Sequence, residues 1–122
     1  MKTLPRRVDK PWGHEIIWAE TDQYVGKVLH IEAGEALSLQ MHVTKDETVH
    51  VFSGRLLLTV GHSSTDLVEI VMEAGEAFHI KPGTVHRMEA LETCDILEAS
   101  TPHLDDLVRL EDRYGRDQDP TR

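Results

Sequence analysis

Residues 34–54 read GEALSLQMHVTKDETVHVFSG, and this stretch decides the fold. Ser38, Gln40 and His42 alternate along its first half, so in a β-strand their side chains share one face. A short turn follows, and Glu47 then opens a second apolar run. Because two strands joined in this way form a hairpin, we expect Glu47 to return beside Gln40 and His42.

A second segment, residues 75–86, carries a further histidine. It reads GEAFHIKPGTVH, in which a Pro-Gly turn ends one strand and leads to His86. The ligands expected from the two segments are Gln40, His42, Glu47 and His86. One neutral oxygen, one carboxylate and two imidazoles suit a divalent metal ion, with zinc as the first choice and manganese, iron or nickel as alternatives. Ser38 and Met88, on the same faces, are expected to line the site rather than to bind the metal.

The rest of the chain is a series of short strands separated by turns. Strands are expected at residues 14–19, 24–32, 54–60, 67–72 and 94–99. Short strands at this spacing, broken by Gly and Pro, indicate an all-β sandwich or barrel. The sequence EAGEA also occurs twice, and its glycines are Gly34 and Gly75. Two similar halves favour a double-sheet barrel in which these two glycines occupy equivalent turns.

Two charged residues fall on faces that are otherwise apolar. Lys27 shares a strand face with Leu29, and Glu98 shares one with Ile96. A carboxyl group in apolar surroundings has a raised pKa and can act as a base, so Glu98 and Lys27 are the candidate proton-transfer residues. A glutamate on an edge strand, paired with an arginine, is the alternative for Glu98. Lys27 and Lys45 are candidate phosphate ligands or proton-transfer groups, and a solvated surface lysine is the alternative for Lys45.

The two ends of the chain are expected to differ from the barrel. Residues 1–11 are interpreted as an irregular arm. Acidic residues followed by apolar residues at helical spacing predict a short helix over residues 105–113. Residues 117–122 are polar and are expected to be disordered. No linker or low-complexity run divides the chain, so residues 1–122 are expected to form a single domain.

The composition narrows the possible partners. The 122 residues carry a net charge of −9, which argues against nucleic acid because nucleic-acid binding depends on clustered Lys and Arg. A sugar phosphate remains possible because it needs only a local cation. Cys94 has no second cysteine to bridge, which fits a reducing compartment. No apolar run suits a signal peptide or a membrane span of roughly 20 residues, so we expect a cytoplasmic protein without a membrane partner.

Both metal-ligand segments resemble the paired motifs of the cupin superfamily, with Gln40 standing where most cupins have a histidine. The resemblance extends to the phosphomannose isomerase domain that follows mannose-1-phosphate guanylyltransferase in bifunctional enzymes. It is carried by KPWG at 10–13, LSLQMH at 37–42, GTVHR at 83–87 and DDLVRLEDRYGR at 105–116. It implies a jelly-roll cupin barrel (a double-stranded β-helix), to which the helix predicted from spacing would be added at the C-terminal end. It also implies a metal-dependent interconversion of mannose 6-phosphate and fructose 6-phosphate.

The resemblance also implies roles for single residues. Lys27 stands where the isomerase domain has a lysine, and Lys45 stands where it has an arginine. Lys and Arg are not equivalent at a phosphate site, because only Arg presents a bidentate fork. Ser38, Lys45 and Arg87 are the expected substrate-binding residues, and Lys27 and Glu98 the expected catalytic ones. A homodimer formed through an edge strand is a further expectation.

Two other functions remain open. A small cupin could hold a metal and a sugar without turnover, and the replacement of the family's arginine by Lys45 fits that alternative. An iron-dependent oxygenase is the second alternative, since cupins host many reactions. Gln40 disfavours the oxygenase, because iron oxygenases generally use histidine-rich or facial-triad ligand sets. The other six histidines are expected to be surface or hydrogen-bonded residues: His14, His30, His50, His62, His79 and His103.

Overall fold

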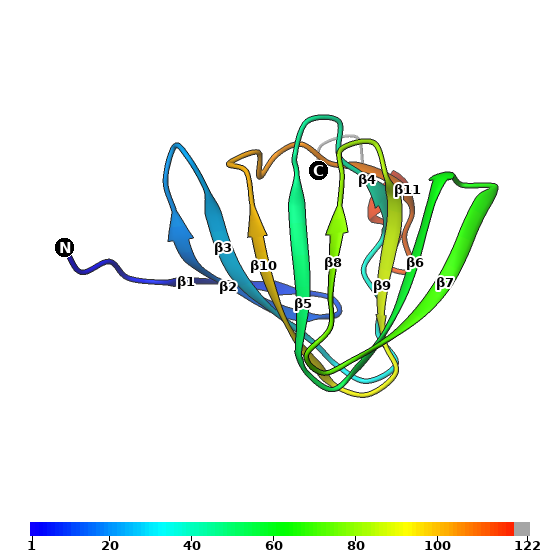
Figure 1. The fold of residues 1–122 in the computed structure, drawn as a ribbon, viewed down its shortest axis with the longest axis horizontal. Coiled ribbons are helices and arrows are strands. Elements are labelled where there is room, and N and C mark those ends of the chain that lie inside the picture. Colours follow the sequence, from blue (N-terminus) through cyan, green and yellow to red (C-terminus); the bar gives the residue numbers. More distant parts are fainter. Residues whose placement is uncertain (119–122) are drawn as a thin grey trace.

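A computed structural model describes residues 1–118, which form two antiparallel sheets packed face to face (Figure 1). The six-stranded sheet comprises, in spatial order, β1 (Arg6–Lys10), β2 (Gly13–Glu20), β3 (Val25–Ile31), β10 (Cys94–Ser100), β5 (Glu47–Ser53) and β8 (Ala77–Ile80). The five-stranded sheet comprises β11 (Val108–Glu111), β4 (Leu39–Met41), β9 (Val85–Ala90), β6 (Arg55–Ser63) and β7 (Asp66–Glu73). A 3₁₀ turn, η1 (Arg116–Gln118), follows β11. The expected all-β jelly roll is confirmed.

The apolar core lies between the two sheets. Alternate residues of each strand point inward, as the two-residue period of a strand requires. Val49 and Val51 of β5, Leu56 and Leu58 of β6, and Ile96 of β10 are all completely buried. The strands converge at one end of the barrel and splay apart at the other, which is the upper end in Figure 1. The splayed end leaves room for a site above the core.

Gly34 and Gly75 occupy equivalent turns, as the repeated EAGEA sequence predicts. Their φ angles are 83° and 94°, a left-handed conformation that glycine adopts without a steric cost. In the first turn the backbone N–H of Glu35 donates to the carbonyl of Glu32, and in the second the backbone N–H of Glu76 donates to the carbonyl of Glu73. The donor–acceptor distances are 2.9 Å around Gly34 and 3.1 Å around Gly75. The two halves of the barrel therefore share their turn geometry.

Both chain ends differ from the expectation. Residues 6–10 form β1, which pairs with β2 through a tight turn, although residues 1–11 were expected to be irregular. Residues 108–111 form β11, which pairs with β4, although a helix was expected over 105–113. The helical spacing was misleading because an isolated helix this short is marginal in water, whereas the edge of β4 offers open backbone groups. Of the tail expected to be disordered, residues 117 and 118 belong to η1, and 119–122 lie outside the described residues.

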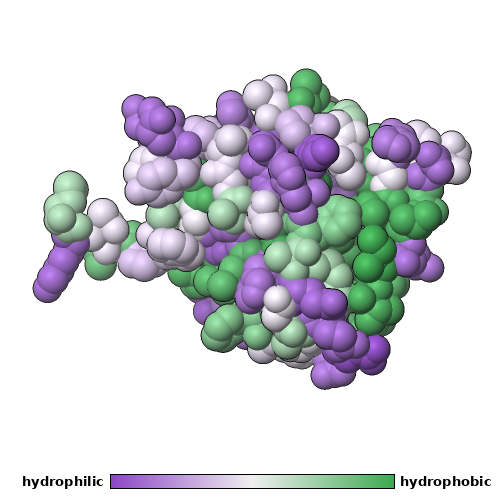
Figure 2. Space-filling view, in the orientation of Figure 1, coloured by the Kyte–Doolittle hydropathy of each residue, from purple (hydrophilic) through white to green (hydrophobic). Residues whose placement is uncertain are grey.

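The sheet edges are formed by β1 and β8 on one sheet and by β11 and β7 on the other. Apolar residues gather over β7 in Figure 2, and Val68 and Val71 of this strand are 60% and 46% exposed. The homodimer expected from the sequence stays a prediction. Within residues 1–118, no helix has both the length and the apolar character needed to cross a membrane.

Candidate metal site and the cavity beside it

Three of the four expected metal ligands converge at the splayed end of the barrel. His42 follows β4, Glu47 begins β5 and His86 lies on β9. Their potential ligand atoms all lie within 4.8 Å of one another, and the three residues are 5%, 3% and 0% exposed. No other group of three His, Cys, Asp or Glu in residues 1–118 has this arrangement. Segments far apart in the sequence therefore meet at one buried point.

Hydrogen bonds fix the proton on each imidazole. His42 Nδ1 lies 2.6 Å from the carbonyl oxygen of Asp106, and His86 Nδ1 lies 2.9 Å from that of Thr84. Because a carbonyl oxygen can only accept, each neutral ring carries its proton on Nδ1. Each Nε2 therefore presents a lone pair, which is the arrangement that metal-binding histidines use.

Within residues 1–118, no positive group contacts all three potential ligand atoms of this cluster, which are the Nε2 atoms of His42 and His86 and a carboxylate oxygen of Glu47. His42 Nε2 lies 2.9 Å from Glu47 Oε2, yet neither buried atom has a well-formed hydrogen bond within residues 1–118. Burial opposes ionisation of Glu47, but the contact with His42 and the charge of Lys45 outweigh it and lower its pKa to about 2. Burial lowers the pKa of His86, which favours the neutral imidazole. Two imidazoles and one carboxylate fit a divalent metal ion.

Gln40 lies beside the cluster but turns its oxygen away from it. The Ser38 hydroxyl donates to Gln40 Oε1 at 2.8 Å, and Gln40 Nε2 lies 3.5 Å from His86 Nε2. A half-turn of the amide exchanges its oxygen and nitrogen without changing its shape. The Ser38 hydroxyl can donate to the oxygen or accept from the amide, so it suits both orientations. Ser38 is buried and supports Gln40; it does not line the cavity, so the structure does not bring it to a substrate-binding position.

A network of lysines and carboxylates adjoins the cluster. Lys45 Nζ lies 3.0 Å from Glu98 Oε2 and 3.4 Å from Glu47 Oε2. Lys27 Nζ lies 3.3 Å from Glu15 Oε2 and 3.8 Å from Glu98 Oε2. All of these residues are at least 92% buried, so Lys45 is not a surface lysine. Glu98 lies on the central strand β10 between two lysines, which excludes the edge-strand alternative.

The environment of Glu98 disfavours its charged form. Burial and the negative charge of Glu47 raise its pKa, while Lys45 and Lys27 lower it in part. For Lys45, burial lowers the pKa, but the charges of Glu98 and Glu47 outweigh burial and raise it overall. The result is a carboxyl group that can exchange a proton beside a lysine that keeps its charge.

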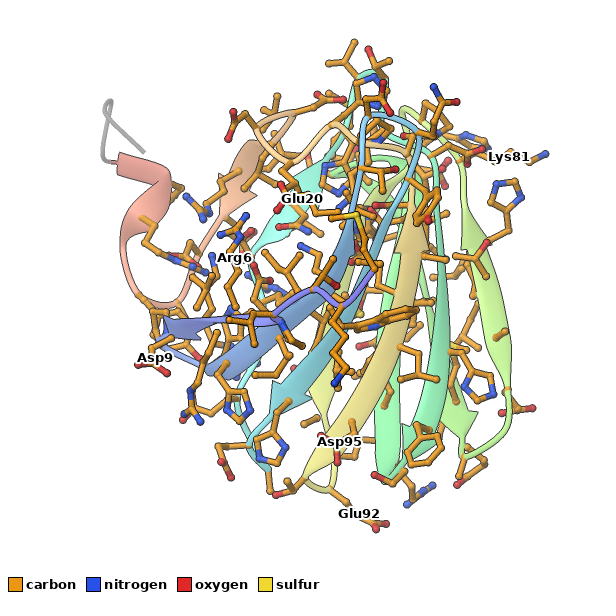
Figure 3. All side chains as sticks on the ribbon, turned by 90° about the vertical axis from the view of Figure 1, so that its left-hand side faces the viewer. Arg6, Asp9, Glu20, Lys81, Glu92 and Asp95 are labelled. Atoms are coloured by element: carbon orange, nitrogen blue, oxygen red, sulfur yellow. The ribbon has the colours of Figure 1, made fainter. Side chains whose placement is uncertain are left out.

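A cavity of about 250 Å³ opens beside this network. Its inner wall includes Gln40, His42, Lys45, Lys27 and Glu98. Residues from β1, β2, the segment before β11, β11 itself and η1 form its mouth. Figure 3 views the molecule from the β1 side, with Arg6 and Glu20 close together. Of the expected metal ligands, Gln40 and His42 therefore line the same cavity as the expected catalytic residues Lys27 and Glu98, whereas Glu47 and His86 do not line it.

Arg87 does not reach this cavity. It follows His86 on β9, and the alternation of a strand turns it to the opposite face. Its Nε donates to the carbonyl of Leu37 at 3.1 Å, and its Nη2 donates to that of Glu111 at 3.2 Å. These contacts tie β9 to β11, and the substrate-binding role expected for Arg87 stays a prediction.

Two residues of the site were not anticipated. Glu15 could have been found, because it alternates with the apolar Ile17 on its strand and thus faces inward. Asp106 gave no signal, because its segment resembled a helix. Its carboxylate accepts the backbone N–H groups of residues 43, 44 and 45 at 2.9, 2.6 and 2.8 Å. These three bonds lower the pKa of Asp106 to about 2 and hold the loop that carries Lys45.

The sequence has relatives among bacterial proteins named as mannose-1-phosphate guanylyltransferases and xanthan biosynthesis proteins. It is 32% identical to mannose-1-phosphate guanylyltransferase ManC of Salmonella typhimurium over 118 residues, which cover 93% of this chain and 24% of ManC. It is also 32% identical to xanthan biosynthesis protein XanB of Xanthomonas campestris over 119 residues, with the same coverage. The chain thus spans about a quarter of the length of these relatives.

Solved structures share the fold. CapF, a capsular polysaccharide assembling protein of Staphylococcus aureus, superposes with a TM-score of 0.75 at 21% identity, over 90% of this chain and 32% of CapF. KdgF of Halomonas gives 0.70 at 20% identity, over 83% of this chain and 91% of KdgF. Bacillus subtilis oxalate decarboxylase gives 0.76 at 13% identity, over 87% and 30%. These neighbours are cupins, and at such identities they support the fold only.

The profile of one family covers nearly the whole chain. It is described as Mannose-6-phosphate isomerase C-terminal and matches residues 1–112, which include every strand of both sheets and each residue of the metal cluster. The cupin barrel, the buried His and Glu donors at its splayed end and this match agree with one another. The chain belongs to the Mannose-6-phosphate isomerase C-terminal family of cupin domains.

Proposed function

We propose that this protein is a metal-dependent aldose-ketose isomerase that acts on a sugar phosphate, of the type that converts mannose 6-phosphate to fructose 6-phosphate. The observation that carries the proposal is the convergence of His42, Glu47 and His86 beside a cavity that also contains Glu98. Family membership supports it. The curated relatives are named as guanylyltransferases or biosynthesis proteins, so the isomerase reaction rests on the site and the family description.

Aldose-ketose isomerisation moves a proton between two neighbouring carbons of the sugar. A divalent metal held by His42, His86 and Glu47, with Gln40 available as a fourth ligand, would supply Lewis acidity toward the sugar oxygens, and zinc is the proposed ion. Glu98 is the proposed base: it faces the cavity, and its raised pKa lets it take a proton from one carbon and return it to the next.

The lysines hold the base in place. Lys45 Nζ lies 3.0 Å from Glu98, and Lys27 Nζ is held between Glu15 and Glu98. Because both neighbours of Lys27 are carboxylates, we assign it to positioning Glu98 and assign proton transfer to Glu98 itself. The apolar side chains of Leu29, Leu37 and Met88 also line the cavity and limit the access of water to the reacting carbons.

The proposal is tested by incubating zinc-loaded protein with mannose 6-phosphate and measuring fructose 6-phosphate. The Gln40→Ala, His42→Ala double variant serves as the control. We expect turnover by the parent protein, and a loss of about 10²–10⁴-fold in kcat for Glu98→Gln, the usual range for a general acid–base group. Product formation no greater than that of the double variant would refute the isomerase.

A binding module without turnover is the second candidate. The ion pairs from Lys45 to Glu98 and Glu47 favour it, because an ammonium group held between both carboxylates restrains the base. Thermal shifts with mannose 6-phosphate, measured alongside product formation, separate the two. Tight binding without product would support the module, and steady product formation would exclude it.

A further inference from the structure

Lysines and arginines gather at the mouth of the cavity, apart from the proposed catalytic groups. Lys10 ends β1, Arg109 lies on β11 and Arg116 lies in η1, and all three line the cavity. They come from segments that the sequence places about 100 residues apart but that the fold brings together. In a chain with a net charge of −9, a cavity mouth with three converging cations is an exception.

The two arginines are close enough to Lys10 for their charges to change its pKa. Burial lowers the pKa of Lys10; the charge of Glu15 opposes this effect, and the positive charges of Arg109 and Arg116 add to it. Lys10 makes no ion pair and no side-chain hydrogen bond among residues 1–118. A half-buried ammonium near other cations, with no anion bound to it, is unfavourable in the absence of a ligand.

Arg116 is already oriented for binding. Its Nε and Nη2 donate to the Asp112 carboxylate at 3.0 and 2.9 Å, and this carboxylate is fully buried. The guanidinium is therefore fixed at the mouth with one nitrogen, Nη1, outside this pair. A planar guanidinium held in this way suits a phosphate oxygen.

The cations deeper in the cavity are neutralised by the protein. Lys27 is paired with Glu15 and Glu98, and Lys45 with Glu98 and Glu47. Among the carboxylates that line the cavity, Asp105 makes no ion pair within residues 1–118, and it offsets one charge of the mouth. At the mouth, Arg116 is likewise paired with Asp112, whereas Lys10 has no ion pair within residues 1–118, so Lys10 is a charge there that an anionic ligand would neutralise.

We propose that Lys10, Arg109 and Arg116 form an anion subsite that takes the phosphate group of the substrate, in place of the phosphate role expected for Lys45 and Lys27. The inference rests on the proposed function for the rest of the ligand. The same cavity is lined by His42 and Gln40 deeper in, so one sugar phosphate can place its phosphate at the mouth and its carbonyl end toward the metal ligands.

Calorimetric titration of the metal-loaded protein with mannose 6-phosphate, mannose and inorganic phosphate tests the subsite. Lys10→Gln is the informative variant, because it removes a charge without removing a hydrogen bond of the described residues. Arg7→Gln is the matched control: Arg7 lies on the same strand, is 59% exposed and pairs with Asp9. We expect Lys10→Gln to weaken mannose 6-phosphate binding by about tenfold or more, as for one charged hydrogen bond, and to leave mannose binding unchanged.

The outcomes separate the subsite from the isomerase. A lower affinity for mannose 6-phosphate in Lys10→Gln, but not in Arg7→Gln, supports the subsite. This holds even if no fructose 6-phosphate forms, and in that case only the proposed function fails. The subsite is overturned if Lys10→Gln binds like the parent protein, or if the parent binds mannose 6-phosphate no better than mannose. If only Lys45→Gln weakened mannose 6-phosphate binding, the phosphate group would bind at the inner lysines. That result would also overturn the subsite.

Discussion

Glu47 carries the charge around which the site is arranged. It is 3% exposed, and the groups nearest its Oε2 are the Nε2 atom of His42 and the ammonium of Lys45, at 2.9 and 3.4 Å. A carboxylate this buried needs partners, because an uncompensated internal charge is costly. Lys45 supplies one partner, and a bound metal would supply the second.

Glu47→Gln tests the contribution of this charge to metal binding. It keeps the side chain's shape but removes the charge, so we expect zinc affinity to fall by more than the roughly 10–100-fold that loss of an outer-shell partner costs. Competition with a chelator measures the affinity. Glu69→Gln is the control, since Glu69 is an exposed residue of β7. Equal affinity in the two variants would remove Glu47 from the ligand set.

Asp106 is expected to position His42, one of the proposed metal ligands. Its carboxylate binds three backbone N–H groups of the loop that follows His42, and its carbonyl accepts from His42 Nδ1. We expect Asp106→Ala to lower zinc affinity by about 10–100-fold through misorientation of the imidazole. The metal-binding isotherm is the measurement.

Asp22→Asn is the control for Asp106→Ala, because Asp22 lies in an exposed turn. An Asp106→Ala protein with lower thermal stability but parental zinc affinity would show that Asp106 supports the loop only. At this scale, the sequence predicted His42, Glu47 and His86 because strand alternation gave their direction. It did not predict Asp106, whose partners lie more than 60 residues away.

Among the elements, the two short strands at the chain ends complete the site. β1 and β11 carry Lys10 and Arg109 to the mouth of the cavity, and neither strand was expected from the sequence. Both pair with an edge of a sheet, so their conformation depends on the neighbouring strand more than on their own residues. The interior strands, in contrast, were predicted well, because each alternates apolar and polar residues between clear turns.

Arg87→Gln tests the attachment of β11. The variant loses the side-chain donors to Leu37 and Glu111, so we expect the free energy of unfolding to fall by about 1–2 kcal/mol. The KM for mannose 6-phosphate should not change, because Arg87 faces away from the cavity. Urea denaturation and initial rates measure the two quantities. A raised KM with an unchanged free energy of unfolding would show that Arg87 takes part in substrate binding.

His30 on β3 should make stability depend on pH. Its hydrogen bond to Asp95 of β10 raises its pKa against the opposing effect of burial, and Glu32 raises it further. The charged form is therefore favoured in the folded state, so its stabilisation is complete below the ordinary value of 6.5 and is lost as pH rises through the raised pKa. His30 also stacks on His14, with ring centroids 4.9 Å apart.

His30→Gln is the variant that tests this dependence. We expect it to lower the free energy of unfolding more at about pH 5.5 than at about pH 9, as measured by urea denaturation. His62→Gln, at an exposed position near the end of β6, should show no such difference. A deficit in His30→Gln that is the same at both pH values would show that the ion pair contributes nothing.

For the whole molecule, function follows from how two sheets close around one core. Strands β4, β5, β9 and β10 bring their polar residues to the splayed end, while their apolar residues fill the interior below. The turns at Gly34 and Gly75 set equivalent crossings between the sheets. The barrel and the meeting of His42, Glu47 and His86 could be predicted because both depend on local alternation. The cavity mouth could not, because it is assembled from both ends of the chain.

The proposed isomerase requires a metal bound where His42, His86 and Glu47 meet. Anomalous diffraction from crystals of the zinc-loaded protein measures this directly. We predict one strong peak about 2.0–2.2 Å from His42 Nε2, His86 Nε2 and a Glu47 carboxylate oxygen. Zinc at another site, or no peak at this position while Lys45 stays against Glu47, would contradict the metal site and the isomerase built on it.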